Sequence, residues 1–360
     1  MKLSSVAPLA VALAATAQAS YINYTTVTGY FLQDEESTDA STFDYTTTNF
    51  GLINRTYPSD SKHKHKDLTQ WERFYNQVIA LNHDAPSNVA YKVLFLGRHG
   101  EGYHNAAEDY YGTPAWNCYW SLLDGNGTTT WRDADLTPTG IHQAEIAHTF
   151  WQTQIQTQHI HTPDNYFVSP LTRALRTANI TFTGLSYPAH SASFTPLIKE
   201  FFRESISIHT CDNRRNASYI HDLFPTWPFE SGFAEYDELW NGVTGETNAA
   251  QDVRSKVALD SIFDDDNNDN TGLYVSVTSH SGEISSLLRV LGHRSFGLST
   301  GAVIPVLVRA ETVCDDEPTS TTTTWTTSLH CTAPPVTSVT GCVCASSAAP
   351  VTTPLVTNAY

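Results

Sequence analysis

Residues 93–105 of this 360-residue chain read Val-Leu-Phe-Leu-Gly-Arg-His-Gly-Glu-Gly-Tyr-His-Asn. The apolar half predicts a buried strand, and the polar half follows its carboxyl end, where an open α/β sheet binds its ligands. Arg98 offers a planar, permanently charged fork that suits phosphate, and His99 can act as a nucleophile or proton carrier near neutral pH. The stretch therefore predicts an α/β fold with phosphate chemistry on a histidine.

Strands and helices are expected to alternate along the rest of the chain. Runs of β-branched and aromatic residues predict strands, and amphipathic patterns predict helices. The strands are expected at 166–168, 273–278 and 303–308, and the helices at 67–80, after the N-cap Thr137, after Pro170, at 249–263 and up to Leu291. This order is typical of a three-layer α/β/α fold with a mainly parallel central sheet.

Two predicted helices follow strands directly and carry basic side chains. Ser169-Pro170 is expected to form the N-cap and first turn of the helix that contains Arg173, and His280 precedes another helix. The carboxyl ends of parallel strands meet at one edge of a sheet. We therefore expect these side chains to converge on Arg98 and His99.

The charge of the chain limits its partners. It carries 37 acidic and 20 basic side chains, a formal net charge of −17. This charge disfavours nucleic acids and anionic membranes as partners, because both require a basic surface. A phosphorylated small molecule fits only if a few cations gather in one pocket.

The first nineteen residues resemble a secretory signal peptide. Lys2 precedes an apolar stretch through Leu13, and Ala17-Gln18-Ala19 resembles a cleavage site. The stretch is too short to span a bilayer, and no later one approaches the roughly 20 apolar residues required. We therefore expect a secreted glycoprotein, in agreement with five glycosylation sequons, at Asn23, Asn54, Asn126, Asn179 and Asn216.

The mature chain is expected to divide at about residue 310. Residues 20–310 form the predicted catalytic domain, of which 20–66 are an irregular N-terminal arm. Residues 311–360 are rich in Thr, Ser and Pro and resemble a glycosylated stalk that would allow association with a cell wall. Disulfides are expected, but their pairing is open, among the distant Cys118 and Cys211 and the tail cysteines Cys314, Cys331, Cys342 and Cys344.

Four motifs occur in order, and together they point to a family. They are Arg98–Glu101 with Asn105, Leu136–Gly140, Ser169–Ala174 with Thr177, and Ser279–Gly282. The succession resembles the histidine phosphatase superfamily, specifically its phosphoglycerate-mutase-like branch, over about residues 90–310. The acid phosphatase and phytase branch is less similar, because Gly102, His104 and Ser281 replace the arginine, proline and aspartate typical there.

Together with the predicted signal peptide, the resemblance implies a secreted, metal-independent phosphomonoesterase that works without a cofactor. His99 would be the nucleophile and form a phosphohistidine. Arg98, Arg173 and His280 would surround the phosphoryl oxygens and stabilise the charge that develops there. A few converging cations would thus be sufficient for an anionic substrate in an acidic protein.

The leaving alcohol requires a proton donor, for which a carboxyl group is suited. The resemblance favours Glu204 over Glu200, because the Arg203-Glu204 pair is most similar to fungal and plant members. Four further residues are expected to bind substrate, namely Glu101, Asn105, Ser281 and Gly282.

Several other features are expected to be structural. The run 264–270 lacks the glycine and glutamate of a calcium loop, and the pairs His63/His65 and His159/His161 lack a partner at ligand spacing. Arg214-Arg215 either contacts the substrate beyond its phosphate or forms salt bridges within a loop. Two other functions stay open: phosphoryl transfer of the phosphoglycerate mutase type, and a non-catalytic surface or wall glycoprotein with the same fold.

Overall fold

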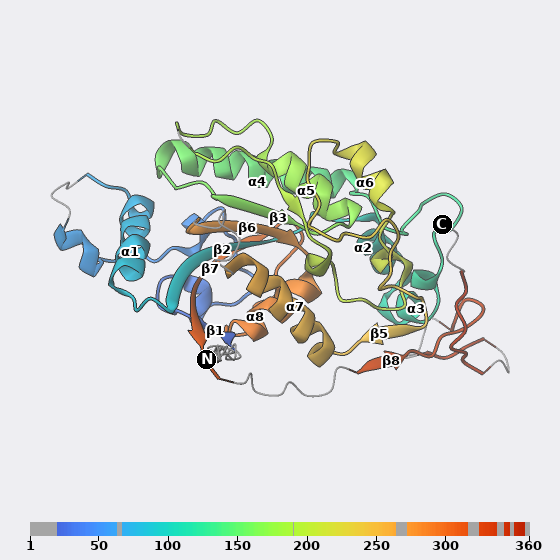
Figure 1. Ribbon diagram of the computed structural model, residues 1–360. Coiled ribbons are helices and arrows are strands. Elements are labelled where there is room, and N and C mark those ends of the chain that lie inside the picture. Colours follow the sequence, from blue (N-terminus) through green and yellow to red (C-terminus); the bar gives the residue numbers. More distant parts are fainter. Residues whose placement is uncertain are drawn as a thin grey trace, which may run out of the picture.

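A six-stranded mixed sheet forms the centre of the computed structural model (Figure 1). Four neighbouring strands are parallel. At one side a fifth strand pairs antiparallel with them, and a sixth pairs antiparallel with the fifth. In spatial order the strands are β1 (Tyr21–Thr26), β7 (Val303–Val313), β2 (Val89–Arg98), β6 (Tyr274–Ser279), β3 (Asn165–Val168) and β4 (Leu197–Ile198). The predicted mainly parallel sheet is confirmed.

The structure describes residues 20–62, 67–189, 191–263, 272–315, 324–336, 342–345 and 349–356. The predicted signal peptide, the acidic run 264–270 and the pair His63/His65 lie outside these ranges. Within them, no helix is both long and apolar enough to cross a membrane.

Helices cover both faces of the sheet and complete three layers. One face packs on α1 (Gln70–Asp84) and α4 (Pro138–Thr157), and the other on α7 (Asn248–Phe263) and α8 (Ser281–Val290). Figure 1 shows α4, with α5 (Thr172–Phe182), on the opposite side of the sheet from α7 and α8. The alternation of residues along β2 explains both cores. Leu94 and Leu96 face α7 and α8, whereas Val93 and Phe95 face α1 and α4.

Strand β7 runs antiparallel to β2 because of the path that precedes it. After α8 the chain crosses back to the edge where β2 ends, and the amide of Gly301 donates to the carbonyl of His99 at 2.9 Å. The chain therefore enters β7 from the carboxyl end of β2. The sequence predicts this strand but not its direction.

The prediction of an irregular arm at 20–66 is wrong for much of that segment. Tyr21–Thr26 pairs with β7 in the central sheet. Phe31 and Phe50 are fully buried in the core beside α1 and α4. Aromatic side chains on short turns bury large areas without producing a helical or strand period, so periodicity did not reveal them.

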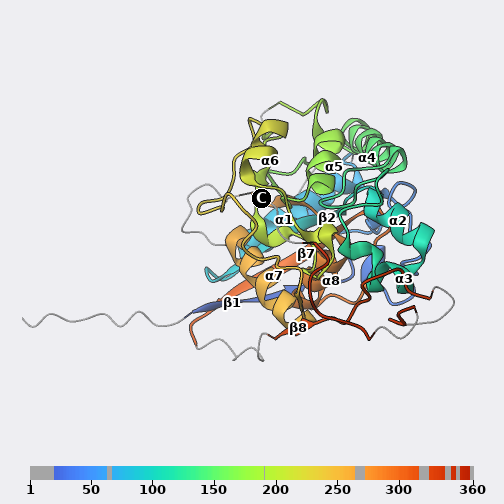
Figure 2. The same cartoon turned by 90° about the vertical axis from the view of Figure 1, so that its right-hand side faces the viewer.

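The C-terminal tail is joined to the catalytic domain. One disulfide links Cys118, at the end of α3 (Thr113–Cys118), to Cys342, and a second links Cys331 to Cys344. Neither uses Cys211 or Cys314. A strand of the tail, β8 (Trp325–Thr327), pairs with β5 (Thr244–Glu246), and Figure 2 shows the tail passing α3.

Candidate active site

The carboxyl ends of β2 and β6 bring two histidines together. Arg98 and Ser279 lie side by side in parallel register, so His99 and His280 follow at the same level. The His99 amide donates to the Ser279 carbonyl at 2.9 Å, and the two imidazole centroids lie 5.0 Å apart. Both side chains are buried. The structure thus brings together two residues that lie 181 positions apart in the sequence.

A single hydrogen bond fixes the tautomer of His99. Its Nδ1 lies 2.6 Å from the carbonyl oxygen of Gly100, which can only accept, so Nδ1 carries the proton. Burial, with the charges of Arg173 and Arg98, holds the pKa of His99 well below its ordinary value of 6.5. The ring is therefore neutral near pH 7, and Nε2 keeps a free lone pair.

Two glycines allow the loop after β2 to pack tightly. A Cβ at Gly100 would collide with the carbonyl of Gly140, and a Cβ at Gly140 would collide with the carbonyl of Glu101. The Gly100 amide also donates to Thr177 Oγ1 at 3.0 Å, and that hydroxyl donates to the Arg173 carbonyl at 2.7 Å. These contacts explain why three of the motifs contain glycine or threonine at these positions.

Helix α5 begins later than the sequence predicts. Its first residue is Thr172 and its N-cap is Leu171, so the expectation that Ser169 is the N-cap is wrong. The Ser169 hydroxyl instead contacts His280 Nε2 at 2.7 Å and accepts from the Leu171 amide at 3.3 Å. A turn therefore separates β3 from the helix, and Ser169 becomes part of the site.

Both arginines of the prediction reach the site. Arg173 is 1% exposed, and its Nη1 donates to the Cys211 carbonyl at 2.8 Å. Arg98 Nη1 donates to the Leu298 carbonyl at 2.6 Å. The Nε atoms of both guanidinium groups are buried and have no hydrogen-bond partner among the described residues.

Glu204 lies against the first turn of α8. Its Oε1 accepts from the amides of Ser205 at 2.8 Å and Glu283 at 3.1 Å, and a Cβ at Gly282 would collide with this oxygen. Burial, together with the charge of Asp212, raises the pKa of Glu204 above its ordinary value of 4.5 despite the nearby arginines. The environment therefore favours the protonated carboxyl group.

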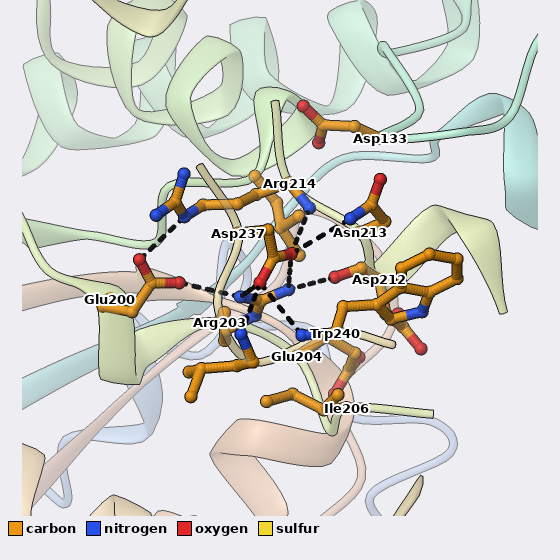
Figure 3. Close-up of polar contacts among 12 residues, drawn as sticks. Asp133, Glu200, Arg203, Glu204, Ile206, Asp212, Asn213, Arg214, Asp237 and Trp240 are labelled. Atoms are coloured by element: carbon orange, nitrogen blue, oxygen red, sulfur yellow. Dashed lines mark hydrogen bonds and ion pairs between the residues drawn. The ribbon is translucent and has the colours of Figure 1, made fainter. Parts of the chain in front are cut away.

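Glu200, the alternative proton donor, is engaged in ion pairs. Its two oxygens lie 2.7 Å from Arg203 Nη1 and 2.7 Å from Arg214 Nε (Figure 3). Arg203 is fully buried and also forms a forked pair with Asp237, at 2.7 and 2.8 Å. Burial alone would raise the pKa of Asp237, but the charge and hydrogen bonds of Arg203 lower it. The geometry thus separates a structural glutamate from Glu204.

The other predicted substrate contacts have local partners. Glu101 Oε1 accepts from Thr137 Oγ1 at 2.6 Å, and Asn105 Oδ1 accepts from the Gly102 amide at 3.0 Å. Ser281 opens α8, directly before the glycine that contacts Glu204. The first two side chains orient the loop after β2, and contact with a substrate stays a prediction for all four.

The adjacent arginines 214 and 215 differ in their surroundings. Arg214 pairs with Glu200 and donates to backbone carbonyls of a loop, so it is the loop-forming residue of the two. Arg215 lines a cavity of about 320 Å³ that is also lined by Arg132 and Tyr103. The structure therefore places Arg214 in the loop, and contact of Arg215 with a substrate stays a prediction.

Sequence reasoning did not single out two buried residues of the site. The His104 ring centroid lies 5.4 Å from that of His99, and Asp212 Oδ1 lies 3.8 Å from Arg173 Nη2. Asp212 Oδ2 also accepts from the Ser207 hydroxyl at 2.5 Å. His104 lies close to the first motif in sequence, but only the folded loop shows that its ring turns toward the site.

One group of potential metal ligands lies beside the site. Atoms of His209, Cys211 and Asp212 lie within 4.8 Å of one another. Burial raises the pKa of the Cys211 thiol well above its ordinary value. Asp212 already accepts a hydrogen bond from Ser207, and we assign no metal role to these three residues.

The fold and this site are those of the histidine phosphatase superfamily, and comparison with known proteins agrees. The chain belongs to the histidine phosphatase superfamily, whose branch 1 model matches residues 94–300. It is 48% identical to a "Probable phosphoglycerate mutase" of Arthroderma benhamiae over 82% of this chain and 86% of that protein. It is 37% identical to "Phosphomutase-like protein 3" of Candida albicans over 82% of each chain.

The solved structures that align with this chain include the phosphoglycerate mutase from Thermus thermophilus. It aligns with a TM-score of 0.33 and 21% identity, covering 60% of this chain and 97% of that one. The family and its phosphoglycerate-mutase-like branch, predicted from four motifs, are confirmed.

Proposed function

We propose that this protein is a secreted phosphomonoesterase that acts through a phosphohistidine on His99. The observation that carries the proposal is a set of buried nitrogens around a neutral imidazole. Arg98 Nε, Arg173 Nε and the Nδ1 atoms of His104 and His280 have no hydrogen-bond partner among the described residues. Buried polar groups normally have one, and an anion with several acceptor oxygens would supply it.

The first half of the proposed reaction transfers the phosphoryl group to His99. Nε2 attacks phosphorus in line with the leaving oxygen, so that the N–P bond forms as the P–O bond breaks. Arg98 and Arg173 stabilise the charge on the equatorial oxygens. The protonated carboxyl group of Glu204 gives its proton to the leaving alcohol.

The second half regenerates the enzyme. The Glu204 carboxylate takes a proton from water, whose oxygen attacks phosphorus as the N–P bond breaks. Inorganic phosphate leaves, His99 is again neutral and Glu204 is again protonated. One ester bond and one water molecule are consumed in each cycle, and the residues of this chain supply every proton transfer.

Phosphoglycerate mutase-type transfer is the second candidate, supported by the names of the two relatives. It uses the same phosphohistidine but returns the phosphoryl group to a second hydroxyl of the substrate. Secretion disfavours it, because an extracellular enzyme would lack a supply of phosphoglycerate and of the bisphosphate that primes such enzymes.

Secretion and glycosylation remain part of the proposal. Two disulfides support an oxidising compartment. Of the five sequons, those at Asn23, Asn54 and Asn126 have exposed side chains, whereas Asn179 lies within α5 and Asn216 caps α6 (Ala217–Leu223). A mass shift on removal of N-linked glycans should therefore map first to the three exposed sites.

The activity is tested with 4-nitrophenyl phosphate, with and without a chelator, and with 3-phosphoglycerate plus a bisphosphate primer. We expect metal-independent release of phosphate that falls about 10⁵-fold or more in His99→Ala, since loss of a nucleophile has effects of that order. The surface variant His159→Ala is the control. Isomerisation of phosphoglycerate without phosphate release would favour the mutase, and equal inactivity of wild type and variant on every phosphate would exclude both.

A further inference from the structure

The C-terminal tail pairs with a strand next to the proton donor. The strap, as we name residues 324–336 and 342–345, contributes β8 to a two-stranded sheet with β5, in which Thr326 faces Gly245. The strap is tied to α3 by the Cys118–Cys342 disulfide and by a hydrogen bond from the Cys331 amide to the Cys118 carbonyl at 2.9 Å. Figures 1 and 2 show β8 and the following tail residues beside β5 and α3.

Strand β5 also holds the segment that carries Glu204. The Glu246 amide donates to the Ile206 carbonyl at 2.7 Å, and Glu246 Oε2 accepts from the Ile206 amide at 3.0 Å. A Cβ at Gly245 would lie 3.2 Å from the Ile206 carbonyl oxygen. One side of β5 therefore contacts the strap, and the other fixes a residue two positions after the proton donor.

Arg254 connects β5 to Glu204 itself. Its guanidinium forms a fork with Glu246, with both distances 2.9 Å, and donates to the carbonyls of Arg203 at 3.0 Å and Glu204 at 3.2 Å. Its Nη1 also lies 3.1 Å from Glu283, whose amide donates to the Glu204 carboxyl group. Arg254 thus contacts the backbone of Arg203 and Glu204 directly. It also contacts Glu283, the residue whose amide binds the Glu204 carboxyl group.

The ladder between β5 and β8 requires an external tether. The two strands have three residues each, and all three β8 side chains are exposed. A two-stranded sheet this short is marginal in water. The disulfide closes a loop between residues 224 positions apart and so keeps β8 close to its partner.

We propose that the strap positions the proton donor, acting through β5, Glu246 and Arg254 on the backbone of Glu204. The proposal rests on the proposed function, because it assigns a role in the same reaction. The tail then contributes to catalysis by holding the Glu204 backbone in place. Glu246 and Arg254 are positioning residues rather than catalytic ones.

Leaving-group dependence gives a specific readout. A 4-nitrophenolate leaves without a proton, whereas the alkoxide of glycerol 2-phosphate must be protonated as it leaves. The ratio of kcat/KM for the two substrates therefore reports how well the donor is placed. A general loss of folded enzyme lowers both values equally and leaves the ratio unchanged.

The first variant is Cys118→Ser, which removes the link to α3. Cys118 is chosen because Cys331 Sγ lies 3.3 Å from Cys118 Sγ. In Cys342→Ser, the Cys118 thiolate would attack Cys331, release Cys344 and restore a link. The control is the double variant Cys331→Ser/Cys344→Ser, which keeps the Cys118–Cys342 disulfide alone.

We expect Cys118→Ser to lower kcat/KM for glycerol 2-phosphate about tenfold, a fraction of the full effect of an acid catalyst. The value for 4-nitrophenyl phosphate should change less than about twofold, as should both values in the control. An unchanged ratio in Cys118→Ser would overturn the proposal. A wild type inactive on both esters would instead overturn the proposed function, so the two failures are distinct.

A second pair of variants avoids the disulfides. Thr326→Pro removes a ladder donor from an exposed strand, whereas Thr326→Val keeps the backbone and a β-branched side chain. The proline variant should shift the ratio in the same direction as Cys118→Ser, and the valine variant should not. Equal ratios in the two Thr326 variants would contradict the role of β8.

Discussion

The phosphate side and the proton-donor side of the site are built in different ways. His99 and His280 follow the ends of neighbouring strands, and the sheet register alone places them together. Glu204 follows the short 3₁₀ turn Glu200–Phe202 in a segment shaped by the buried arginines 203 and 254. The first side depends on backbone ladders and the second on buried charge pairs, so substitutions should affect them differently.

On the donor side, the largest loss of stability is expected from Arg203→Met. It leaves Asp237 buried without its forked partner, and breaking a buried pair costs about 3–5 kcal/mol. Urea unfolding should show this loss. The matched control is Arg289→Met, which breaks a half-exposed pair with Asp252 and should cost no more than about 1 kcal/mol. Equal losses in the two variants would contradict the importance of burial.

On the phosphate side, Arg173→Ala should reduce the activity of the folded protein, measured as kcat per folded molecule. Removing one donor from a charge-stabilising site lowers kcat by about 10²- to 10³-fold. Arg176 lies one turn further along the same helix and forms a half-exposed pair with Asp135. Arg176→Ala should therefore retain nearly wild-type kinetics, and an equal loss in both variants would argue against a phosphate site at Arg173.

The boundary between the two sides is tested by Gly282→Ala. The added methyl group would collide with Glu204 Oε1, and a displacement of about 1 Å can cost up to about 100-fold in rate. We expect a loss of about 10- to 100-fold in kcat/KM for glycerol 2-phosphate. Gly297→Ala is the control, because a Cβ there meets no atom within 4 Å. If Gly282→Ala left kcat/KM unchanged, the proton donor would have to be a group other than Glu204.

The pH profile of kcat/KM should report both sides at once. His99 must be neutral, and its lowered pKa sets the acid limb below pH 6.5. Glu204 must be protonated, and its raised pKa sets the basic limb above pH 4.5. Activity should therefore rise through the first pKa and fall through the second. Glu204→Gln should lower the rate and remove the basic limb only, whereas a basic limb that persists would assign the proton donor to another group.

The same contrast explains what the sequence predicted. Strands β2, β3, β6 and β7 and the helices that flank them were predictable from periodicity, and so were His99, Arg173 and His280, which follow the ends of three of these strands. Ser169 was assigned to the wrong role because a turn of two residues separates it from its helix. The choice between Glu200 and Glu204 depended on contacts with Arg203 and Arg214, which no local pattern encodes.

The contacts of the C-terminal tail could not be predicted from local sequence patterns either. Its composition indicates a stalk, and no property of the sequence near Trp325 predicts pairing with residues 244–246. The Cys118–Cys342 pairing likewise depends on where α3 lies relative to the strap. Long-range pairing of short exposed strands is a property of the folded chain and not of local propensity.

The most direct test of the account is to trap the phosphoenzyme. Wild-type protein is mixed with 4-nitrophenyl phosphate, quenched in alkali within milliseconds, where phosphohistidine survives, and digested for mass spectrometry. The proposed mechanism predicts one phosphoryl group on His99, formed at a rate that matches or exceeds turnover and absent from His99→Ala. Turnover without any adduct, or an adduct on another residue, would contradict it.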